Sequence, residues 1–339
     1  MYPVRFPRNQ WYVLARTEEL GETPLARTVL GQPVVLFRDE TGTPSALEDR
    51  CLHRSMPLSM ARLRGGRLQC RYHGLTYDGG GNVTDIPCQA GVPAGRKARN
   101  YPLVHGRHLI WMWPGDPDRA DPALLPDIGW LEDPEWHTVG GLLYARARAQ
   151  LLNENLTDLS HVSYLHEGSI GTEDVARIPI EVEVEGRTLK VYRPMPDVEC
   201  PPFFSKVMGI TGRITRDSVA EFVPPSYHIS HVGARPLEPA DAPTRRHRAV
   251  HCITPETETT AHYHWLLARD YRCEDAEVDD LWLTGAPRVI GEDVEAVEAI
   301  ESVLRRHPAE GPAEINISAD AGSLRARTLI EKLIADDDR

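Results

Sequence analysis

Four residues in two short segments have the types and the spacing that hold an iron–sulfur cluster. The chain reads Cys51-Leu52-His53 and, further on, Cys70-Arg71-Tyr72-His73. A [2Fe–2S] cluster with two thiolates on one iron and two neutral imidazoles on the other needs this mixture of ligands. The imidazoles raise the reduction potential well above that of an all-cysteine cluster, and their second nitrogens can titrate. The pattern therefore predicts electron transfer.

Zinc is the alternative occupant, because two cysteines and two histidines also suit tetrahedral Zn²⁺. Zinc sites of this composition usually combine a C-x2–4-C pair with an H-x3–5-H pair. In this chain each segment supplies one cysteine and one histidine. The spacing therefore favours the iron–sulfur cluster over zinc.

A second polar group interrupts an apolar, helix-like run over residues 151–168. It comprises Asn155, Asp158, His161 and His166. Two histidines five residues apart would lie roughly 140° apart on an ideal helix. For both to bind one ion, the helix must end, bulge or bend between them, and a π-type bulge is one solution.

A carboxylate for such an ion is expected in the C-terminal part of the chain. Asp293 begins an apolar i, i+4, i+7, i+11 stripe with Val297, Ile300 and Leu304, where an unpaired charge would be costly. Three glutamates read as the solvated face of the same helix: Glu295, Glu298 and Glu301. His161, His166 and Asp293 would form the facial triad of a non-haem Fe(II) site with open positions for O2 and substrate. A buried salt bridge is the alternative role for Asp293, and Glu292 is the alternative ligand.

Length and composition indicate a soluble globular protein of two domains, or of one domain with a large elaboration. The chain has 339 residues and a net charge of −12. The first 118 residues carry the basic surplus, including Arg62, Arg64, Arg67, Arg96, Lys97 and Arg99. These side chains form either a solvated surface or a docking face for an acidic electron donor. The acidic overall charge disfavours binding to nucleic acid. The sequence has no long apolar run and no apolar signal core at residues 1–7, which predicts a cytoplasmic protein without membrane contact.

The remaining cysteines lack motif spacing, so we expect reduced, buried thiols at Cys88, Cys200, Cys252 and Cys273.

Local patterns divide the chain into residues 1–118, a Pro-rich linker at 119–137 and residues 138–339. Short strands are expected at 11–15, 34–37 and 109–113, with glycine turns at 65–66 and 79–81. The second domain should contain strands within 178–191, 207–232, 249–253 and 260–268, followed by helices at 290–306 and 324–335.

Both polar groups and their flanks resemble one known family. Residues 49–58 and 70–82 are similar to the Rieske [2Fe–2S] domain of ring-hydroxylating and demethylating oxygenases. Met56 and Tyr72 stand where respiratory Rieske proteins carry a disulfide, which favours the oxygenase branch. Residues 155–166, 254–260, 292–293 and 318–327 resemble the catalytic domain of Rieske non-haem iron oxygenases, in the α-subunit group of vanillate O-demethylase, dicamba demethylase and toluenesulfonate methyl-monooxygenase.

The resemblance implies an α+β protein: a Rieske β-sandwich domain followed by a helix-grip catalytic domain with an antiparallel sheet, assembled as a head-to-tail homotrimer. It also implies one Rieske cluster on Cys51, His53, Cys70 and His73, and one mononuclear Fe(II). In that family the residue matching Asp158 bridges a cluster histidine of one subunit to an iron histidine of the next, which corresponds to His73 and His161. The residue matching Asn155 lies near the iron, although Asn155 could equally have a local capping role.

The expected function is the terminal oxygenase of a multicomponent monooxygenase. NADH would act only indirectly, through a separate reductase or ferredoxin, and O2 would hydroxylate and demethylate a small, methoxylated aromatic substrate. An aromatic-ring dioxygenase or an N-demethylase would use the same metal centres. A pure electron carrier is disfavoured because it would not need the second domain. A hydrolase is disfavoured because the sequence contains no hydrolase motif. Candidate pocket residues lie between Ile178 and Trp282: Met208, Tyr227, His228, His251, Trp265 and Trp282.

Overall fold

The computed structural model describes residues 5–106, 108–239, 241–306 and 314–338. Part of the segment inspected for a signal core, residues 1–4, lies outside the described residues. The chain divides into two compact units. The N-terminal unit comprises Arg8–Leu125 and Glu256–Glu258, and the C-terminal unit comprises Pro126–Pro255 and the chain from Thr259, with the segment before Arg8. The break after Leu125 falls inside the linker expected at 119–137.

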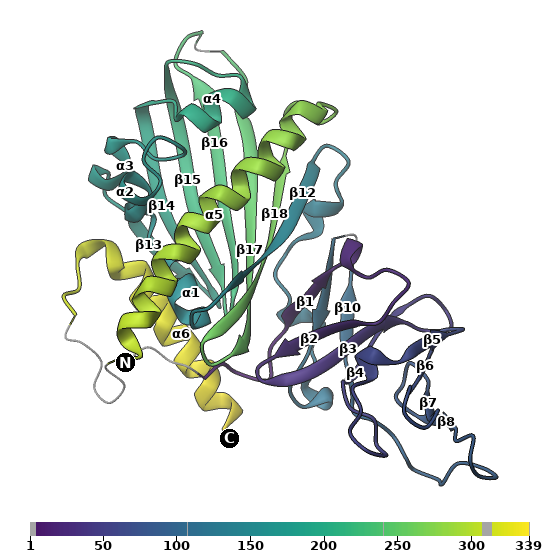
Figure 1. The fold of residues 1–339 in the computed structure, drawn as a ribbon. Coiled ribbons are helices and arrows are strands. Elements are labelled where there is room, and N and C mark those ends of the chain that lie inside the picture. The colour runs from purple at the N-terminus through teal and green to yellow at the C-terminus, as the bar shows by residue number, and fades with distance from the viewer. Residues whose placement is uncertain (1–4, 107, 240, 307–313, 339) are drawn as a thin grey trace. The chain divides into compact units, whose positions relative to one another are not determined.

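Three small antiparallel sheets build the N-terminal unit (Figure 1). The first has the order β1-β11-β10, with β1 at Tyr12–Arg16, β11 at Leu109–Met112 and β10 at Leu103–His105. The second has the order β2-β3-β4-β9, with strands at Leu25–Val29, Gln32–Arg38, Pro44–Glu48 and Asn100–Tyr101. The third has the order β5-β6-β7-β8, with strands at Arg62–Arg64, Arg67–Gln69, Thr76–Tyr77 and Val83–Asp85. Short 3₁₀ helices occur at Thr17–Glu19, Leu58–Met60, Pro117–Arg119 and Pro122–Leu124.

A seven-stranded antiparallel sheet forms the body of the C-terminal unit. Its order is β12-β18-β17-β16-β15-β14-β13. The strands are β12 His137–Ala145, β13 Glu181–Glu185, β14 Thr188–Glu199, β15 Arg213–Val223, β16 Tyr227–Pro236, β17 Arg245–Thr257 and β18 Thr260–Arg269. The sheet alternates buried and exposed side chains along β15, as a sheet with one covered face should. This unit matches the expected α+β class.

Helices cover one face of this sheet. Helix α5, Ala276–Leu304, lies diagonally across the strands (Figure 1). The others are α1 Ala149–Thr157, α2 Val162–Leu165, α3 Glu173–Arg177, α4 Pro202–Met208 and α6 Ala321–Asp337, with 3₁₀ turns at Gly129–Glu132, Leu159–His161 and Ser318–Asp320. Among the described residues, no helix is long and apolar enough to cross a membrane.

Helix α5 is longer than its sequence pattern predicts. The helix expected at 290–306 begins fourteen residues earlier. Asp275 is its N-cap, and the Asp275 side chain accepts a hydrogen bond from the Glu277 N–H. Gly285 and Pro287 obscure the helical pattern in this first half. Packing explains the glycine, because a Cβ at Gly285 would lie 2.4 Å from the Phe203 ring. Tertiary contact thus outweighs weak local propensity.

One expected strand boundary and the expected burial of two cysteines are also wrong. Residues 207–208 end helix α4 rather than beginning a strand. Cys88 is exposed and Cys273 is half-buried, whereas Cys200 and Cys252 are buried as expected. All six cysteines are free thiols in the structure.

Candidate active site

The two cluster segments form matching loops in the N-terminal unit. In each loop the cysteine N–H donates to the carbonyl five residues later, Met56 at 2.8 Å or Leu75 at 2.8 Å. In each loop the cysteine carbonyl also accepts from the N–H four residues later, Ser55 or Gly74, at 3.0 Å. That fourth residue has a positive φ in both loops, 55° at Ser55 and 78° at Gly74. Both loops are therefore closed turns of one geometry that direct their side chains toward a common point.

Burial differs between the cysteines and the histidines of these loops. Cys51 and Cys70 are each 2% exposed and pack in the apolar core of the unit. His53 and His73 are exposed, and their Nδ1 atoms lie 3.0 Å apart. The Tyr77 hydroxyl lies 3.3 Å from Cys51 Sγ and accepts from the Leu52 N–H. This arrangement fits a [2Fe–2S] cluster whose thiolate iron is buried and whose imidazole iron faces solvent.

A second group of ligand atoms meets in the C-terminal unit. His161, His166 and Asp293 each place one donor atom within 4.8 Å of the others. Asp293 Oδ1 lies 3.1 Å from His166 Nε2 and 3.4 Å from His161 Nε2. His166 is 2% exposed and Asp293 is 5% exposed. Two imidazole nitrogens and one carboxylate oxygen could hold a six-coordinate ion with positions left for other ligands.

A break in the helix brings the two histidines together. Helix α1 ends at Thr157, because Asp158 is extended with φ −108° and ψ 102°. A 3₁₀ turn then carries His161, and the single turn of α2 follows. The end of α1 therefore precedes both histidines, whereas α2, which follows His161, ends at Leu165, just before His166; this is one of the expected solutions. Residues 149–166 contain no π-helix.

Each histidine uses its other nitrogen within the protein. His161 Nδ1 lies 2.5 Å from the Asp158 carbonyl, and His166 Nδ1 lies 2.6 Å from Glu292 Oε2. A donor at Nδ1 leaves Nε2 of each ring as the acceptor that a metal requires. Glu292, the alternative metal ligand, therefore orients His166 in this geometry instead of facing the donor group.

The local charges act differently on the two histidines. Burial lowers the pKa of His161, partly offset by Asp293. Burial also opposes protonation of His166, but hydrogen bonds to Asp293 and Glu292 raise its pKa. In the described part of the chain Asp293 pairs with no lysine or arginine; its other contact is the Asn155 amide, which donates to Oδ1 at 3.0 Å. The surroundings of Asp293 therefore fit a cation better than a buried salt bridge.

The face of α5 that carries Asp293 differs from the expected stripe. Asp293, Val297 and Leu304 are buried, but Ile300 is exposed. Glu301, expected on the solvated face, is 1% exposed. It accepts from Arg148 Nε at 2.6 Å and Nη2 at 3.1 Å. A partner on another helix allows this glutamate to be buried, which periodicity alone does not reveal.

Asp158 has local partners within the chain. Its carboxylate accepts from Ser160 N at 2.8 Å and Ser160 Oγ at 2.9 Å. His161 is bound by the main-chain carbonyl of Asp158 rather than by this carboxylate. The predicted bridge to a neighbouring subunit concerns contacts that a single chain does not contain.

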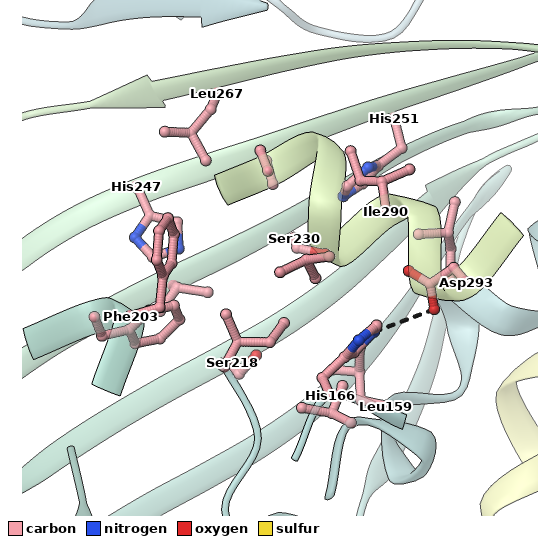
Figure 2. A pocket seen from close by; sticks show the side chains of 18 of the residues that line it. Leu159, His166, Phe203, Ser218, Ser230, His247, His251, Leu267, Ile290 and Asp293 are labelled. Atoms are coloured by element: carbon pink, nitrogen blue, oxygen red, sulfur yellow. Dashed lines mark ion pairs between the residues drawn. The ribbon is translucent and has the colours of Figure 1, made fainter. Parts of the chain in front are cut away.

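A largely apolar cavity of about 130 Å³ opens beside the three donors. Figure 2 shows His166 and Asp293 at one end, with Phe203 and His247 at the other. An engineered apolar cavity of roughly 150 Å³ accommodates benzene, so this volume suits a single aromatic ring. The cavity is therefore a candidate substrate pocket.

Half of the predicted pocket residues line this cavity. His251, Trp265 and Trp282 do so. Met208, Tyr227 and His228 are buried elsewhere, and His228 lies 2.9 Å from the Asn153 side chain. Sequence reasoning missed several lining residues: Arg193, Phe203, Phe204, Arg216, Ser218, Ser230 and His247. The polar residues of this set lie on the neighbouring strands β14 to β17. In β14 and β15 they take the buried positions of a pattern that alternates along the strand, and this pattern was present in the sequence.

Protein-family models match both parts of the chain. The Rieske [2Fe-2S] domain matches residues 10–101, and the vanillate O-demethylase oxygenase C-terminal domain matches residues 145–336. The chain thus belongs to the family of Rieske non-haem iron oxygenase components, and it is an oxidoreductase of the monooxygenase class.

Individual relatives are similar over nearly the whole chain. A vanillate O-demethylase oxygenase subunit from a Pseudomonas species is 33% identical over 97% of this chain and 95% of its own length. The oxygenase component of dicamba O-demethylase from Stenotrophomonas maltophilia is 36% identical over 97% of this chain and 98% of its own length. A crystal structure of dicamba monooxygenase bound to dicamba is 34% identical, with a TM-score of 0.91 over 100% of this chain and 99% of that one.

The left-handed residue of the second cluster loop offers a test of that loop. At Gly74 a Cβ would lie 2.8 Å from Pro87 Cγ, in addition to the unfavourable positive φ. Gly74→Ala should therefore destabilise the unit by about 1–3 kcal/mol and reduce cluster content, measured by thermal unfolding and visible absorbance. Gly42→Ala is the control, because Gly42 also has a positive φ, 81°, but nothing within 4 Å of its Cβ position. Equal effects of the two changes would contradict the steric account.

Removal of one imidazole tests the separation of the two metal sites. His161→Ala should lower the iron-to-sulfide ratio from about 3:2 to about 1:1 and leave the visible absorbance of the cluster intact. Tyr164→Ala is the matched control, since Tyr164 lies in the adjacent helix turn with an exposed side chain. Loss of the visible absorbance in His161→Ala would show that the two sites are misassigned.

Proposed function

We propose that this chain is the terminal oxygenase that demethylates a small methoxylated aromatic compound. The observation that carries the proposal is the position of His161, His166 and Asp293 at the end of a ring-sized cavity. In this proposal Cys51, His53, Cys70 and His73 hold the Rieske cluster, and the three donors hold one Fe(II). The similarity to vanillate and dicamba O-demethylase components supports the substrate class.

The residues of the C-terminal unit have separate roles in this reaction. When bound, the cluster supplies electrons and the Fe(II) supplies O2 activation. Glu292 and the Asp158 carbonyl orient the two imidazoles, and Asn155 orients the Asp293 carboxylate. The apolar lining, which includes Trp265, Trp282 and Ile290, excludes water and positions the ring. Insertion of one oxygen atom into a methyl C–H bond of an ether gives a hemiacetal, which collapses to formaldehyde and a phenol, while the second oxygen atom leaves as water.

The electrons require a separate donor in this proposal. A reductase or ferredoxin would pass them from NADH to the cluster, and the exposed His53 and His73 offer the point of entry. The exposed basic side chains of Arg62, Arg64, Arg96 and Lys97 suit an acidic donor. Arg67 is less available, because it pairs with Glu40.

Assembly as a homotrimer in the cytoplasm remains part of the proposal. A trimer would let Asp158 join the two centres: its main-chain carbonyl binds His161, and its carboxylate would bind His73 of the neighbouring subunit. Among the described residues, the half-buried carboxylate of Asp158 accepts hydrogen bonds only from Ser160, so its remaining lone pairs can accept a further imidazole N–H.

An aromatic-ring dioxygenase or an N-demethylase is the second candidate, since both use the same metal centres. The family match to an O-demethylase catalytic domain favours ether cleavage.

Formaldehyde release distinguishes these candidates. With NADH and a partner reductase, methoxybenzoates should yield formaldehyde and the matching phenol in about equal amounts. N-methyl compounds, which would yield formaldehyde and an amine, should not be turned over. A cis-diol without formaldehyde would contradict the demethylase proposal.

Asp158→Asn tests the electron path. The amide can still cap the Ser160 N–H, and the main-chain carbonyl still binds His161, so both metals should be retained. Turnover should fall by roughly 100-fold because the carboxylate that would bind His73 of the neighbouring subunit is lost. The measurement is the rate of cluster reoxidation by O2 in the presence of substrate. A wild-type rate in this variant would remove Asp158 from the path.

A further inference from the structure

An unpaired guanidinium lies in the wall of the cavity. Arg216, on β15, is 6% exposed and lines the cavity. Its Nη1 makes one long contact of 3.4 Å to the Ile170 carbonyl, and its Nε has no hydrogen-bond partner. The guanidinium also lies 4.7 Å above the Phe204 ring. In the described part of the chain no carboxylate pairs with Arg216, so a buried positive charge is left largely uncompensated.

Neighbouring groups do not neutralise this charge. Arg193 on β14 is also buried, but its guanidinium is occupied by the carbonyls of Leu159 and Val175, at 3.0 and 2.9 Å. Burial and the charge of Arg193 lower the pKa of Arg216 to about 10, so that Arg216 stays charged at neutral pH. Burial raises the pKa of the nearby Cys200 thiol, which is therefore no thiolate partner. Two positive charges thus share one side of the cavity.

Strand register places Arg216 at the end of the cavity that lies away from the metal donors. On the covered face, cross-strand partners on β15, β16 and β17 form rows across the sheet, and Arg216 pairs with Ala234 in the first of them. The next rows are Ser218–Val232–His247, Ala220–Ser230–Ala249 and Phe222–His228–His251. The charge of Asp293 acts on His251, in the last row, whereas that of Arg216 acts on His247. Figure 2 shows Ser218 and Ser230 between His247 on one side and Asp293 on the other. The cavity therefore has a cationic end and a metal-donor end.

We infer that Arg216 binds an anionic group of the aromatic substrate, a carboxylate or a sulfonate, at the end of the cavity remote from His161, His166 and Asp293. The inference rests on the proposed function and deepens it. A guanidinium presents a fork of N–H donors that matches such oxyanions. Because the anion and the oxidised methyl group would lie at opposite ends, substrates that carry them para on the ring should bind better than ortho isomers.

The positive charge of Arg216 also determines how strongly anionic ligands should be preferred over neutral ones. A charge-assisted hydrogen bond in a desolvated site contributes enough to change affinity by about 10- to 100-fold. An uncharged amide of the same shape leaves the guanidinium uncompensated and should lose that factor. Replacement of Arg216 by methionine removes an unpaired buried charge at similar volume, so the variant should fold at least as stably as the wild type without ligand.

Titration calorimetry on the metal-loaded chain tests the assignment. The ligands are 4-methoxybenzoate, 4-methoxybenzenesulfonate, 2-methoxybenzoate and neutral 4-methoxybenzamide. The proteins are the wild type, Arg216→Met, Arg216→Lys and the control Arg213→Met. Arg213 lies on the same strand, exposed, and pairs with Asp197. Thermal unfolding without ligand accompanies each variant.

We expect the wild type and Arg213→Met to bind the two para anions at least tenfold more tightly than the amide. Arg216→Met should lose this preference without a lower unfolding temperature, and Arg216→Lys should retain part of it. Relative affinities of the carboxylate and the sulfonate identify which anion the site prefers. An unchanged preference in Arg216→Met, a wild type that binds the amide as tightly as the anions, or a preference for the ortho isomer would overturn the assignment.

Formaldehyde assays separate this inference from the proposed function. Demethylation of neutral ethers without any anion preference would remove the anion site and leave the function. Tight, Arg216-dependent binding of the anions without formaldehyde would leave the anion site and remove the demethylase function.

Discussion

The architecture of the C-terminal unit depends on one buried carboxylate. Asp293 lies in the middle of α5 at 5% exposure, where an uncompensated negative charge would be strongly unfavourable. Its compensation comes from three side chains of a different part of the chain, Asn155, His161 and His166. Helix α5 must therefore lie across the sheet with this face toward α1 and α2, and the cavity is the space left between that face and the strands.

The histidine side chains differ in solvent exposure between the two centres. In the N-terminal unit the cysteines are buried and the histidines are exposed. In the C-terminal unit His166 is buried, His161 is half-buried, and both histidines line a largely apolar cavity. Electron acceptance needs contact with a partner protein, so an exposed imidazole edge is an advantage there. Oxygen chemistry needs water to be kept away, and the second centre is accordingly covered.

Much of this site could be predicted from residue type and spacing. The cluster segments and the pair His161 and His166 are local patterns, and Asp293 was visible as a charge in an apolar stripe. Contacts between distant segments were not visible. Glu301 looked solvated because Arg148, which pairs with it in addition to Arg305, is distant in the sequence, at the N-cap of α1. The first half of α5 was obscured by Gly285 and Pro287, whose surroundings only the folded chain supplies.

The inward arginines are an intermediate case. Along β15 the buried positions are Ile214, Arg216, Ser218, Ala220 and Phe222. A period of two therefore places a charge on the covered face, and the sequence contained this information. It was not decisive, because a strand that alternates charged and apolar residues fits either face until the register with its neighbours is known.

Protein contacts help to position the donors of the second centre. Arg148, the N-cap residue of α1, and Asn155 within α1 are about two turns apart, and they contact Glu301 and Asp293, which are about two turns apart on α5. Glu292 fixes His166 in the same way. Such contacts reduce the entropy that is lost when an ion binds, which strengthens binding of any divalent ion of suitable size. Since such N and O donors generally bind Co²⁺, Ni²⁺ and Cu²⁺ more tightly than Fe²⁺, a rigid site of this kind cannot select iron by affinity. The metal carried by such a site therefore depends on geometry and on which ions are available to it as well as on affinity.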